Sequence, residues 1–287
     1  ALGCMTFGVE TAEADARRQL DTFVEAGGTF IDTADVYGDG ESERIIGRWA
    51  ADRGGVDDLI VATKGRFAPP AGSAGASRRS LTRSVDASLS RLGLDAIDVY
   101  FVHGWDNETP VEETLDTLSS LVRVGKLHNI AWSNMTGWQL QEVITTARLG
   151  GYVSPVAVQP QYNLLDRGIE LEVLPCCLSA GLAITPWSPL GGGWLAAKYQ
   201  RDAKPTGATR LGDDPTRGVE AYDTRNNDRT WRIIDVLTAV AAEVDALGLP
   251  PYPYGMIEDF CDVDVCAVSA LLLDAPWREL GDDSFSW

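Results

Sequence analysis

The stretch IDVYFVHGWDNETPVEETLDTLSSLVRVGKLHNIAWSN, residues 97–134, carries the pattern that decides the fold. An apolar run at 97–103 is followed by a segment at 111–124 whose apolar residues recur with helical spacing. A glycine and a second apolar run at 127–133 come next. Short runs that are apolar on both faces, each followed by a helix, are typical of parallel strands joined by crossover helices. The stretch therefore predicts a strand–helix–strand unit.

The same unit recurs along the first two thirds of the chain. We expect strands at 2–7, 29–34, 58–64, 97–103, 127–133, 153–159 and 182–187, with helices at 12–26, 41–52, 78–92, 111–124, 137–148 and 169–180. Seven such units in 287 residues favour an α/β fold of the (β/α)8 or TIM barrel type, formed by one domain over 1–287. A doubly wound dinucleotide fold is the alternative, but no G-x-G-x-x-G turn follows an early strand.

The last third of the chain reads differently. Residues 191–227 are rich in Gly, Pro and Asp and predict a long loop, a feature that in a compact domain is often functional. A helix is expected over 228–247. The tail at 248–287 has no clear pattern, although 263–268 would serve as an atypical eighth strand and 275–280 as an atypical last helix.

The amino-acid composition limits the classes of binding partner that we expect. The formal net charge of −18 would repel phosphate backbones and anionic lipids, so we expect neither nucleic acid nor membrane as a partner. No apolar run is long enough to span a membrane, and the first residues do not resemble a signal peptide. The five cysteines have no zinc-type spacing, which favours reduced thiols, no metal and a cytoplasmic protein. The sequence does not indicate an oligomeric state.

Polar side chains end several expected strands, where a barrel of this type gathers its chemistry. Asp32, Lys64 and His103 end the second, third and fourth strands, and Tyr37 follows the second. Each alone has a structural explanation as a cap, a solvated lysine or a core histidine. Because a buried Lys or Asp is costly unless paired, we expect Asp32 to pair with Lys64. The Lys64 ammonium should bring the pKa of Tyr37 closer to working pH.

Together these groups suit one kind of chemistry. Tyr37 would protonate a carbonyl oxygen, to which His103 would also donate a hydrogen bond, while a hydride arrives at the carbon. None of these side chains supplies a hydride, so a cofactor is expected. A barrel glycosidase with Asp32 and Asp35 as its carboxylate pair is an alternative, but a lysine and a histidine on neighbouring strands fit it poorly.

The chain resembles the aldo-keto reductases, in the bacterial branch that is related also to the potassium-channel β subunits. The matching stretches occur in family order within residues 1–245, at 3–8, 30–38, 62–64, 98–103, 133–134, 159–163 and 187–190. The resemblance implies reduction of an aldehyde or ketone to an alcohol by NADPH, with NADH possible, and a small-molecule carbonyl substrate. It implies a tetrad in which Tyr37 is the general acid, made of Asp32, Tyr37, Lys64 and His103.

The resemblance also implies a set of cofactor-binding residues. Ser133, Asn134 and Gln159 would hold the nicotinamide carboxamide, and Trp187 would stack on its ring. Gly3 and Met5 would border the cofactor from the first strand. Along the pyrophosphate, under the covering loop 191–227, would lie Ser188, Leu190 and Lys198.

The tail departs from the family. Residues 248–287 lack the Ser or Arg, followed by Gln and Asn, that grip the adenosine and its 2′-phosphate. Natural divergence, a reading-frame change and engineering would each produce such a tail. The departure keeps open an alternative function, a nicotinamide-nucleotide-binding regulatory or sensing protein with little turnover. Trp105, Trp132 and Trp194 are candidates for an aromatic pocket, or for packing.

Overall fold

The computed structural model describes residues 1–67, 74–207, 209–212 and 214–246, in two compact units. The first unit comprises Ala1–Gln161 and Gly168–Trp187. The second comprises Tyr162–Arg167 and the described part of Ser188–Trp287.

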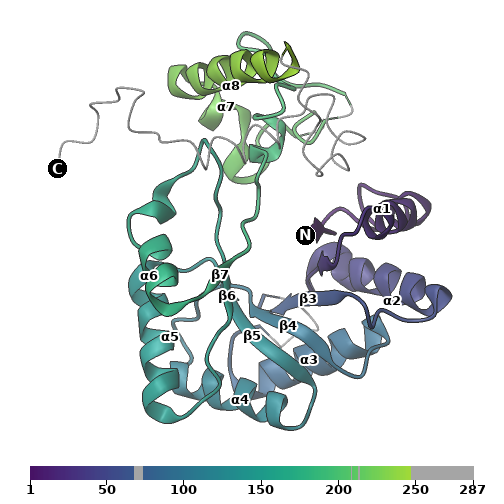
Figure 1. Ribbon diagram of the computed structural model, residues 1–287, viewed down its shortest axis with the longest axis vertical. Helices are drawn as coiled ribbons and strands as arrows, with labels where there is room; N and C mark the ends of the chain where they lie inside the picture. Colours follow the sequence, from purple (N-terminus) through teal and green to yellow (C-terminus); the bar gives the residue numbers. More distant parts are fainter. Residues whose placement is uncertain (68–73, 208, 213, 247–287) are drawn as a thin grey trace. The chain divides into compact units, whose positions relative to one another are not determined.

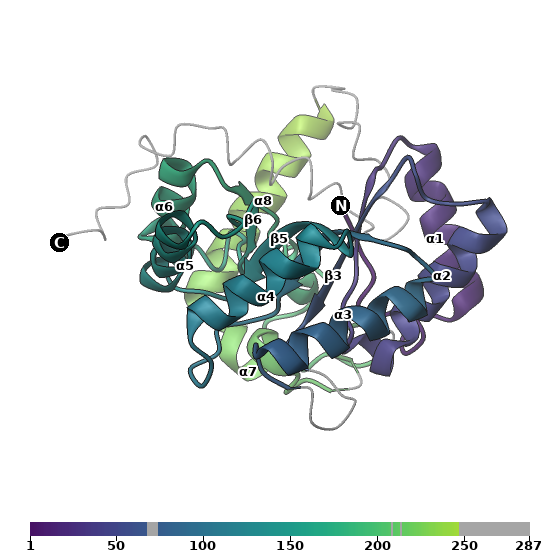
Figure 2. The same ribbon diagram turned by 90° about the horizontal axis from the view of Figure 1, so that it is seen from below.

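The first unit is built on a parallel sheet in which each strand pairs with the next along the chain. Its strands are β1 (Leu2–Gly3), β2 (Phe30–Asp32), β3 (Ile60–Gly65), β4 (Ile97–Val102), β5 (Leu127–Ser133), β6 (Ala157–Gln159) and β7 (Ala183–Ile184). The connecting helices are α1 (Glu13–Glu25), α2 (Glu41–Arg53), α3 (Arg78–Leu92), α4 (Val111–Arg123), α5 (Gly137–Gly150) and α6 (Val173–Ala180). The single-turn helices η1 (Tyr37–Gly40) and η2 (Gly168–Glu170) complete the unit. Successive helices contact one another outside the strands (Figures 1 and 2).

The two faces of the sheet bury different side chains. Because side chains alternate along a strand, every second residue points away from the helices. Those residues form a small inner cluster of Ala62, Val99, Phe101, Ala131 and Ala157. The residues between them, such as Val61, Tyr100 and Ile130, join the large core under the helices. The sheet curls, since the side chains of Asp32 on β2 and Gln159 on β6 meet on the inner face.

The seven predicted strands are confirmed in order and direction, but several are shorter than expected. The strand expected at 153–159 is paired as β6 only over Ala157–Gln159, and Pro155 before it has no N–H to donate to a ladder. The strand expected at 182–187 is the two-residue β7, which ends before Pro186. The eighth strand and last helix expected at 263–268 and 275–280 lie outside the described residues.

The second unit has its own apolar core. The predicted loop 191–227 contains the short helices η3 (Gly191–Gly193), η4 (Gly218–Glu220) and α7 (Tyr222–Arg225), and the predicted helix at 228–247 is α8 (Asp228–Ala246). Trp194 is fully buried, with its ring centroid 4.8 to 5.5 Å from those of Tyr199, Tyr222 and Trp231. Trp194 is therefore a core residue of this unit.

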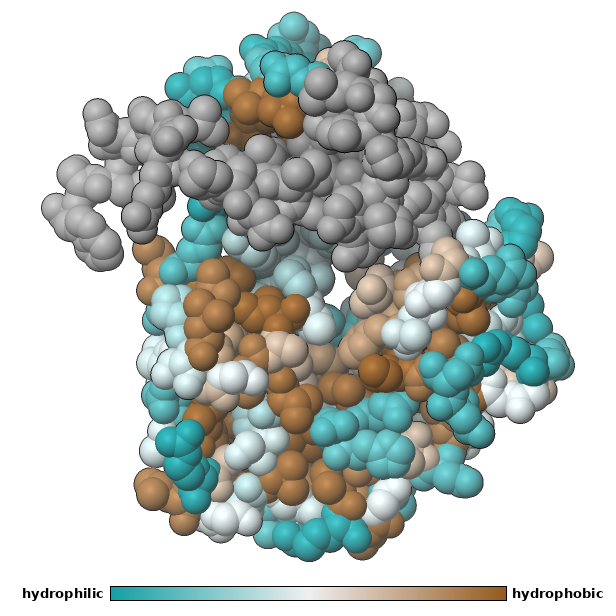
Figure 3. Space-filling model, in the orientation of Figure 1, coloured by the Kyte–Doolittle hydropathy of each residue, from teal (hydrophilic) through white to brown (hydrophobic). Residues whose placement is uncertain are grey.

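The part of the chain that the structure describes has no membrane-spanning helix, no metal cluster and no disulfide among its cysteines. None of its helices combines the length and apolarity needed to cross a bilayer. It contains no group of three or more His, Cys, Asp or Glu placed to hold a metal ion. Its cysteines are free thiols at Cys4, Cys176 and Cys177. Hydrophilic and hydrophobic residues are interspersed over the visible face of the first unit (Figure 3).

Candidate active site

Strand alternation explains why the polar strand ends converge. Asp32, Lys64, Ser133 and Gln159 each stand two residues after an apolar residue of the inner face, so they share that face. The parallel register staggers them: Asp32 pairs with Ala62, two residues before Lys64, and Lys64 pairs with Phe101. Ser133 pairs with Gln159. The inner face of the sheet thus ends in polar groups at the carboxyl ends of its strands.

Lys64 is the centre of the site. Its side chain is fully buried, and Nζ donates to Asp32 Oδ2 at 2.6 Å, to the Thr33 carbonyl at 2.8 Å and to the Tyr37 hydroxyl at 3.3 Å. An ammonium has three protons, so each has an acceptor. Burial alone lowers the pKa of Lys64, but the Asp32 carboxylate and Tyr37 outweigh it and hold that pKa above its ordinary value. The expected pairing of Asp32 with Lys64 is present.

Tyr37 receives a hydrogen bond from Lys64, which leaves its own hydroxyl proton free to be donated. Burial raises the pKa of Tyr37, and the nearby Lys64 ammonium lowers it by less than burial raises it. The expectation that Lys64 would bring this pKa down is therefore wrong in its net direction, because desolvation of the phenolate dominates. Tyr37 consequently keeps its proton at neutral pH, as a proton donor must.

His103, directly after β4, is a neutral imidazole. Burial lowers its pKa to about 3, helped by the charges of Lys64 and Arg66. Its Nδ1 is buried without a hydrogen-bond partner. Its ring lies edge-on to that of Tyr37, with 6.1 Å between centroids. A neutral His103 thus lies beside a protonated Tyr37.

The side chains expected at the carboxamide already have hydrogen-bond partners within the first unit. The Trp187 indole N–H donates to Asn134 Oδ1 at 2.8 Å, and Asn134 Nδ2 donates to the His103 carbonyl at 3.1 Å. Asn134 has a φ of +54°, which asparagine adopts more readily than most residues. Ser133 Oγ donates to the Gln159 carbonyl at 2.7 Å, and Gln159 Nε2 donates to Asp32 Oδ1 at 3.1 Å.

The remaining predicted cofactor residues divide between the two units. Gly3 lies on β1 beside Asp32, and Met5 follows it, 37% exposed. Ser188 belongs to the second unit, with a φ of +58° and an Oγ that donates to Glu220 Oε1 at 2.9 Å. Leu190 packs against the core of that unit, and the Lys198 N–H donates to the Gly193 carbonyl at 3.4 Å.

An aromatic side chain beside His103 was not predicted from the sequence. The centroid of the Phe67 ring lies 5.1 Å from that of the His103 ring, and Phe67 is 48% exposed. Cζ of the Arg66 guanidinium lies 4.6 Å from the Phe67 ring centroid. Arg66 has a φ of +126° and donates from Nη2 to the Trp105 carbonyl at 2.6 Å. The signal was available, because both residues directly follow β3, whose last two residues are Lys64 and Gly65.

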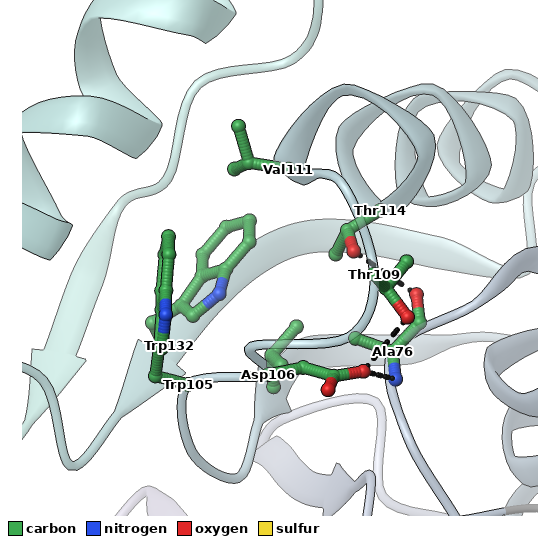
Figure 4. A pocket seen from close by; sticks show the side chains of 8 residues that line it. Ala76, Trp105, Asp106, Thr109, Val111, Thr114 and Trp132 are labelled. Atoms are coloured by element: carbon green, nitrogen blue, oxygen red, sulfur yellow. Dashed lines mark hydrogen bonds between the residues drawn. The ribbon is translucent and has the colours of Figure 1, made fainter.

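Two of the three tryptophans proposed for an aromatic pocket do line a common hollow (Figure 4). Trp105 and Trp132 face it, together with Asp106, which accepts hydrogen bonds from the Ala76 N–H and the Thr109 hydroxyl. Its volume of about 10 Å³ suffices for one water molecule and no more. The hollow is therefore a packing feature of the loop after β4, and Trp194 lies in the second unit.

Asp35 does not join Asp32 as a carboxylate pair. Its Oδ2 accepts a hydrogen bond from Ser84 Oγ on α3 at 2.7 Å, and Asp35 is 4% exposed. Asp32 is held by Lys64 and Gln159 instead. The two carboxyl groups thus have separate partners, which argues against glycosidase chemistry at this site.

Comparison with known proteins agrees with this arrangement. Residues 1–245 match the profile of the Aldo/keto reductase family. A norsolorinic acid reductase of Emericella nidulans is 40% identical over 218 residues, which are 70% of this chain and 56% of that protein. An aryl-alcohol dehydrogenase [NADP(+)] of Phanerodontia chrysosporium is 31% identical over 252 residues, 84% of this chain and 64% of that protein.

A human aflatoxin B1 aldehyde reductase member 2 is 34% identical over 204 residues, 71% of this chain and 56% of that protein. The family match covers most of the chain, so the protein belongs to the Aldo/keto reductase family. The chain spans less than two thirds of the length of each of these three relatives.

Proposed function

We propose that the protein reduces the carbonyl group of a small aldehyde or ketone to an alcohol, with NADPH as hydride donor and Tyr37 as general acid. The observation that carries the proposal is the line of contacts from Asp32 through Lys64 to Tyr37, with neutral His103 beside it. The names of the relatives support it, since they describe an aldehyde reductase, an acid reductase and an NADP-dependent dehydrogenase.

The side chains fit a nicotinamide cofactor. His103 has a buried, unpartnered Nδ1, Asn134 is hydrogen-bonded to the Trp187 indole, and the Gln159 amide is hydrogen-bonded to Asp32. These polar groups and the aromatic ring suit an amide on a flat heterocycle. Bound there, the cofactor would supply the hydride that no side chain can. Ser133, Asn134 and Gln159 would hold the carboxamide and Trp187 would face the ring. Gly3, Met5, Ser188, Leu190 and Lys198 complete the proposed set.

In this proposal the chain's own residues position and transfer one proton. Lys64 orients the Tyr37 hydroxyl by donating to its oxygen, and Asp32 holds Lys64 charged and in place. Tyr37 then donates its proton to the substrate oxygen, and His103 stabilises that oxygen with a hydrogen bond. The Lys64 ammonium favours the phenolate that remains.

Further parts of the proposal rest on the family resemblance. They are a closed eight-stranded barrel in one domain over 1–287, a loop at 191–227 that covers the cofactor, and a divergent tail at 248–287. They also include membership of the branch related to the potassium-channel β subunits and cofactor use that includes NADH. The proposed cytoplasmic location rests on the cysteine pattern instead.

The direct test follows NADPH absorbance at 340 nm in the presence of aromatic and aliphatic aldehydes. We expect turnover that depends on both enzyme and aldehyde, with one alcohol formed for each NADPH consumed. Tight cofactor binding without turnover of any aldehyde would contradict the proposal. That outcome would favour the regulatory or sensing role, which the sequence also allows.

A further inference from the structure

A second polar cluster lies behind Lys64, between the sheet and helix α3. Tyr100 on β4 donates from its hydroxyl to Ser84 Oγ at 3.0 Å, and Ser84 donates to Asp35 Oδ2 at 2.7 Å. Tyr100 is fully buried, and Ser84 and Asp35 are each 4% exposed. The proposed reaction uses none of these three residues, yet Asp35 Oδ1 is buried without a hydrogen-bond partner, and such unsatisfied groups are uncommon in native structures.

The cluster of Tyr100, Ser84 and Asp35 is connected through the backbone to both Lys64 and Tyr37. The Asp35 N–H donates to the Lys64 carbonyl at 3.0 Å, and Asp35 stands two residues before Tyr37. Lys64 Nζ in turn donates to the carbonyl of Thr33, at the other end of the same turn. A side chain at Gly65 would clash with Ser84 and Tyr100, so the cluster packs directly against the backbone that follows Lys64.

We propose that Asp35 is a positioning residue: through the Tyr100–Ser84–Asp35 chain its protonated carboxyl group fixes the turn 33–37, and its ionisation loosens that turn. The proposal rests on the proposed function for its effect on turnover. Its effect on the turn does not depend on it.

The surroundings of Asp35 explain why its charge matters. Asp35 Oδ1 is buried and has no hydrogen-bond partner, so a charge on this carboxylate is poorly solvated. The net pKa of Asp35 is raised to about 6, and burial is the largest cause. The Ser84 hydrogen bond lowers this pKa, and Glu43 on α2 raises it. Arg91 on α3 and the Val36 N–H also lower it. The carboxyl group therefore changes its charge between pH 5 and pH 7, near the pKa of about 6.

Tyr37, Lys64 and His103 do not account for titration in that range. The pKa values of Tyr37 and Lys64 lie above their ordinary values of 10.0 and 10.5, and that of His103 is about 3. An inflection near pH 6 that disappears in Asp35→Asn would therefore report Asp35 itself.

The experiment measures kcat and KM from pH 5 to pH 8 for the wild type, Asp35→Asn and Ser84→Ala. We expect wild-type kcat to fall about threefold or more as Asp35 ionises, with KM nearly constant. Asp35→Asn should keep the low-pH rate across the whole range. In Ser84→Ala the inflection should move to higher pH, because a bond that lowers the pKa of Asp35 is lost.

Asp98→Asn serves as the matched control. Asp98 is a carboxylate on β4 that holds the Val61 N–H at the amino-terminal side of the sheet, so its variant should keep the wild-type profile. Superimposable profiles for wild type and Asp35→Asn, or a downward shift in Ser84→Ala, would overturn the proposal.

A readout without turnover separates this proposal from the proposed function. Hydrogen exchange of a peptide that contains residues 33–37 should be equal in wild type and Asp35→Asn at pH 5, and slower in the variant at pH 7.5. If no aldehyde is reduced but this difference appears, the positioning role stands and the proposed function fails. Equal exchange at both pH values overturns the positioning role, even if the enzyme is active.

Discussion

The Lys64 ammonium lies 2.6 Å from the Asp32 carboxylate, and the Lys64 side chain has no exposed surface. This ion pair stabilises the charged form of the buried Lys64 side chain. Of the three hydrogen bonds that Lys64 Nζ donates, one goes to the Tyr37 hydroxyl. Both partners come from strand ends that alternation places on the inner face of the sheet. The pair therefore links the stability of the sheet to the orientation of the proposed acid.

Lys64→Met should reduce both stability and activity. It leaves Asp32 charged in a largely buried place, and removal of one partner of a buried pair typically costs about 3–5 kcal/mol. Urea denaturation at pH 7 measures the loss. The double variant Asp32→Asn/Lys64→Met is the control and should recover part of it, because no unpaired charge remains. A single variant as stable as wild type would mean that the pair adds nothing to folding.

Tyr37→Phe should abolish most of the carbonyl reduction while cofactor affinity stays within about twofold. Only the transferred proton and one acceptor of Lys64 are lost, and general acid catalysis is commonly worth about 10²–10⁴-fold. Single-turnover NADPH oxidation gives the rate, and fluorescence titration gives the affinity. Retention of more than half of the wild-type rate would exclude Tyr37 as the acid.

Acid should destabilise the protein through His103. The pKa of His103 is about 3 in the folded state against about 6.5 when unfolded, so the unfolded chain binds a proton that the folded chain does not. Protonation of His103 therefore has no effect on the free energy of unfolding above pH 6.5. That free energy decreases as the pH falls toward 3, by about 3 kcal/mol at pH 4. His103→Gln should therefore lose less stability than wild type between pH 7 and pH 4. His128→Gln, which alters an exposed histidine, should behave as wild type.

Asp35 should have the opposite pH dependence. Its folded pKa of about 6 lies above its ordinary value of 3.8, so the folded state holds its proton more tightly. Stability is lost as the pH rises from about 4 to about 6, by up to about 3 kcal/mol. Asp35→Asn should accordingly be more stable than wild type at pH 8 and nearly equal to it at pH 4. A variant less stable than wild type at pH 8 would show that the Asp35 charge is well accommodated.

Much of the fold and of the central site followed from two periodicities in the sequence. Alternation of apolar strands and amphipathic helices predicted the parallel sheet, and the polar residues at the ends of those strands predicted that Asp32, Lys64 and Tyr37 would meet. The lengths of β6 and β7 were overestimated, because an apolar run shows burial and does not show where pairing stops.

Other features depend on three-dimensional contacts that spacing does not encode. The net pKa of Tyr37 depends on how deeply the hydroxyl is buried, and the sequence showed only that Lys64 would be near. Asp35 was considered as a partner of Asp32 because the two are close in sequence. Its actual partner, Ser84, is 49 positions away on α3 and has no local signal.

The tail of the sequence leads to a prediction about cofactor choice. NADPH differs from NADH by a 2′-phosphate, which proteins select with charged hydrogen-bond donors. Residues 270–280 contain one cation, Arg278, and Asp274 is a source of repulsion. We therefore expect a preference for NADPH over NADH below about tenfold, or about 1.4 kcal/mol. Titration with each cofactor, followed by tryptophan emission, gives both affinities, and Trp187→Phe identifies the share of quenching that arises at the proposed nicotinamide site. Submicromolar NADPH binding with a hundredfold preference would show that other cations hold the phosphate, and Lys198→Met and Arg210→Met would then identify them.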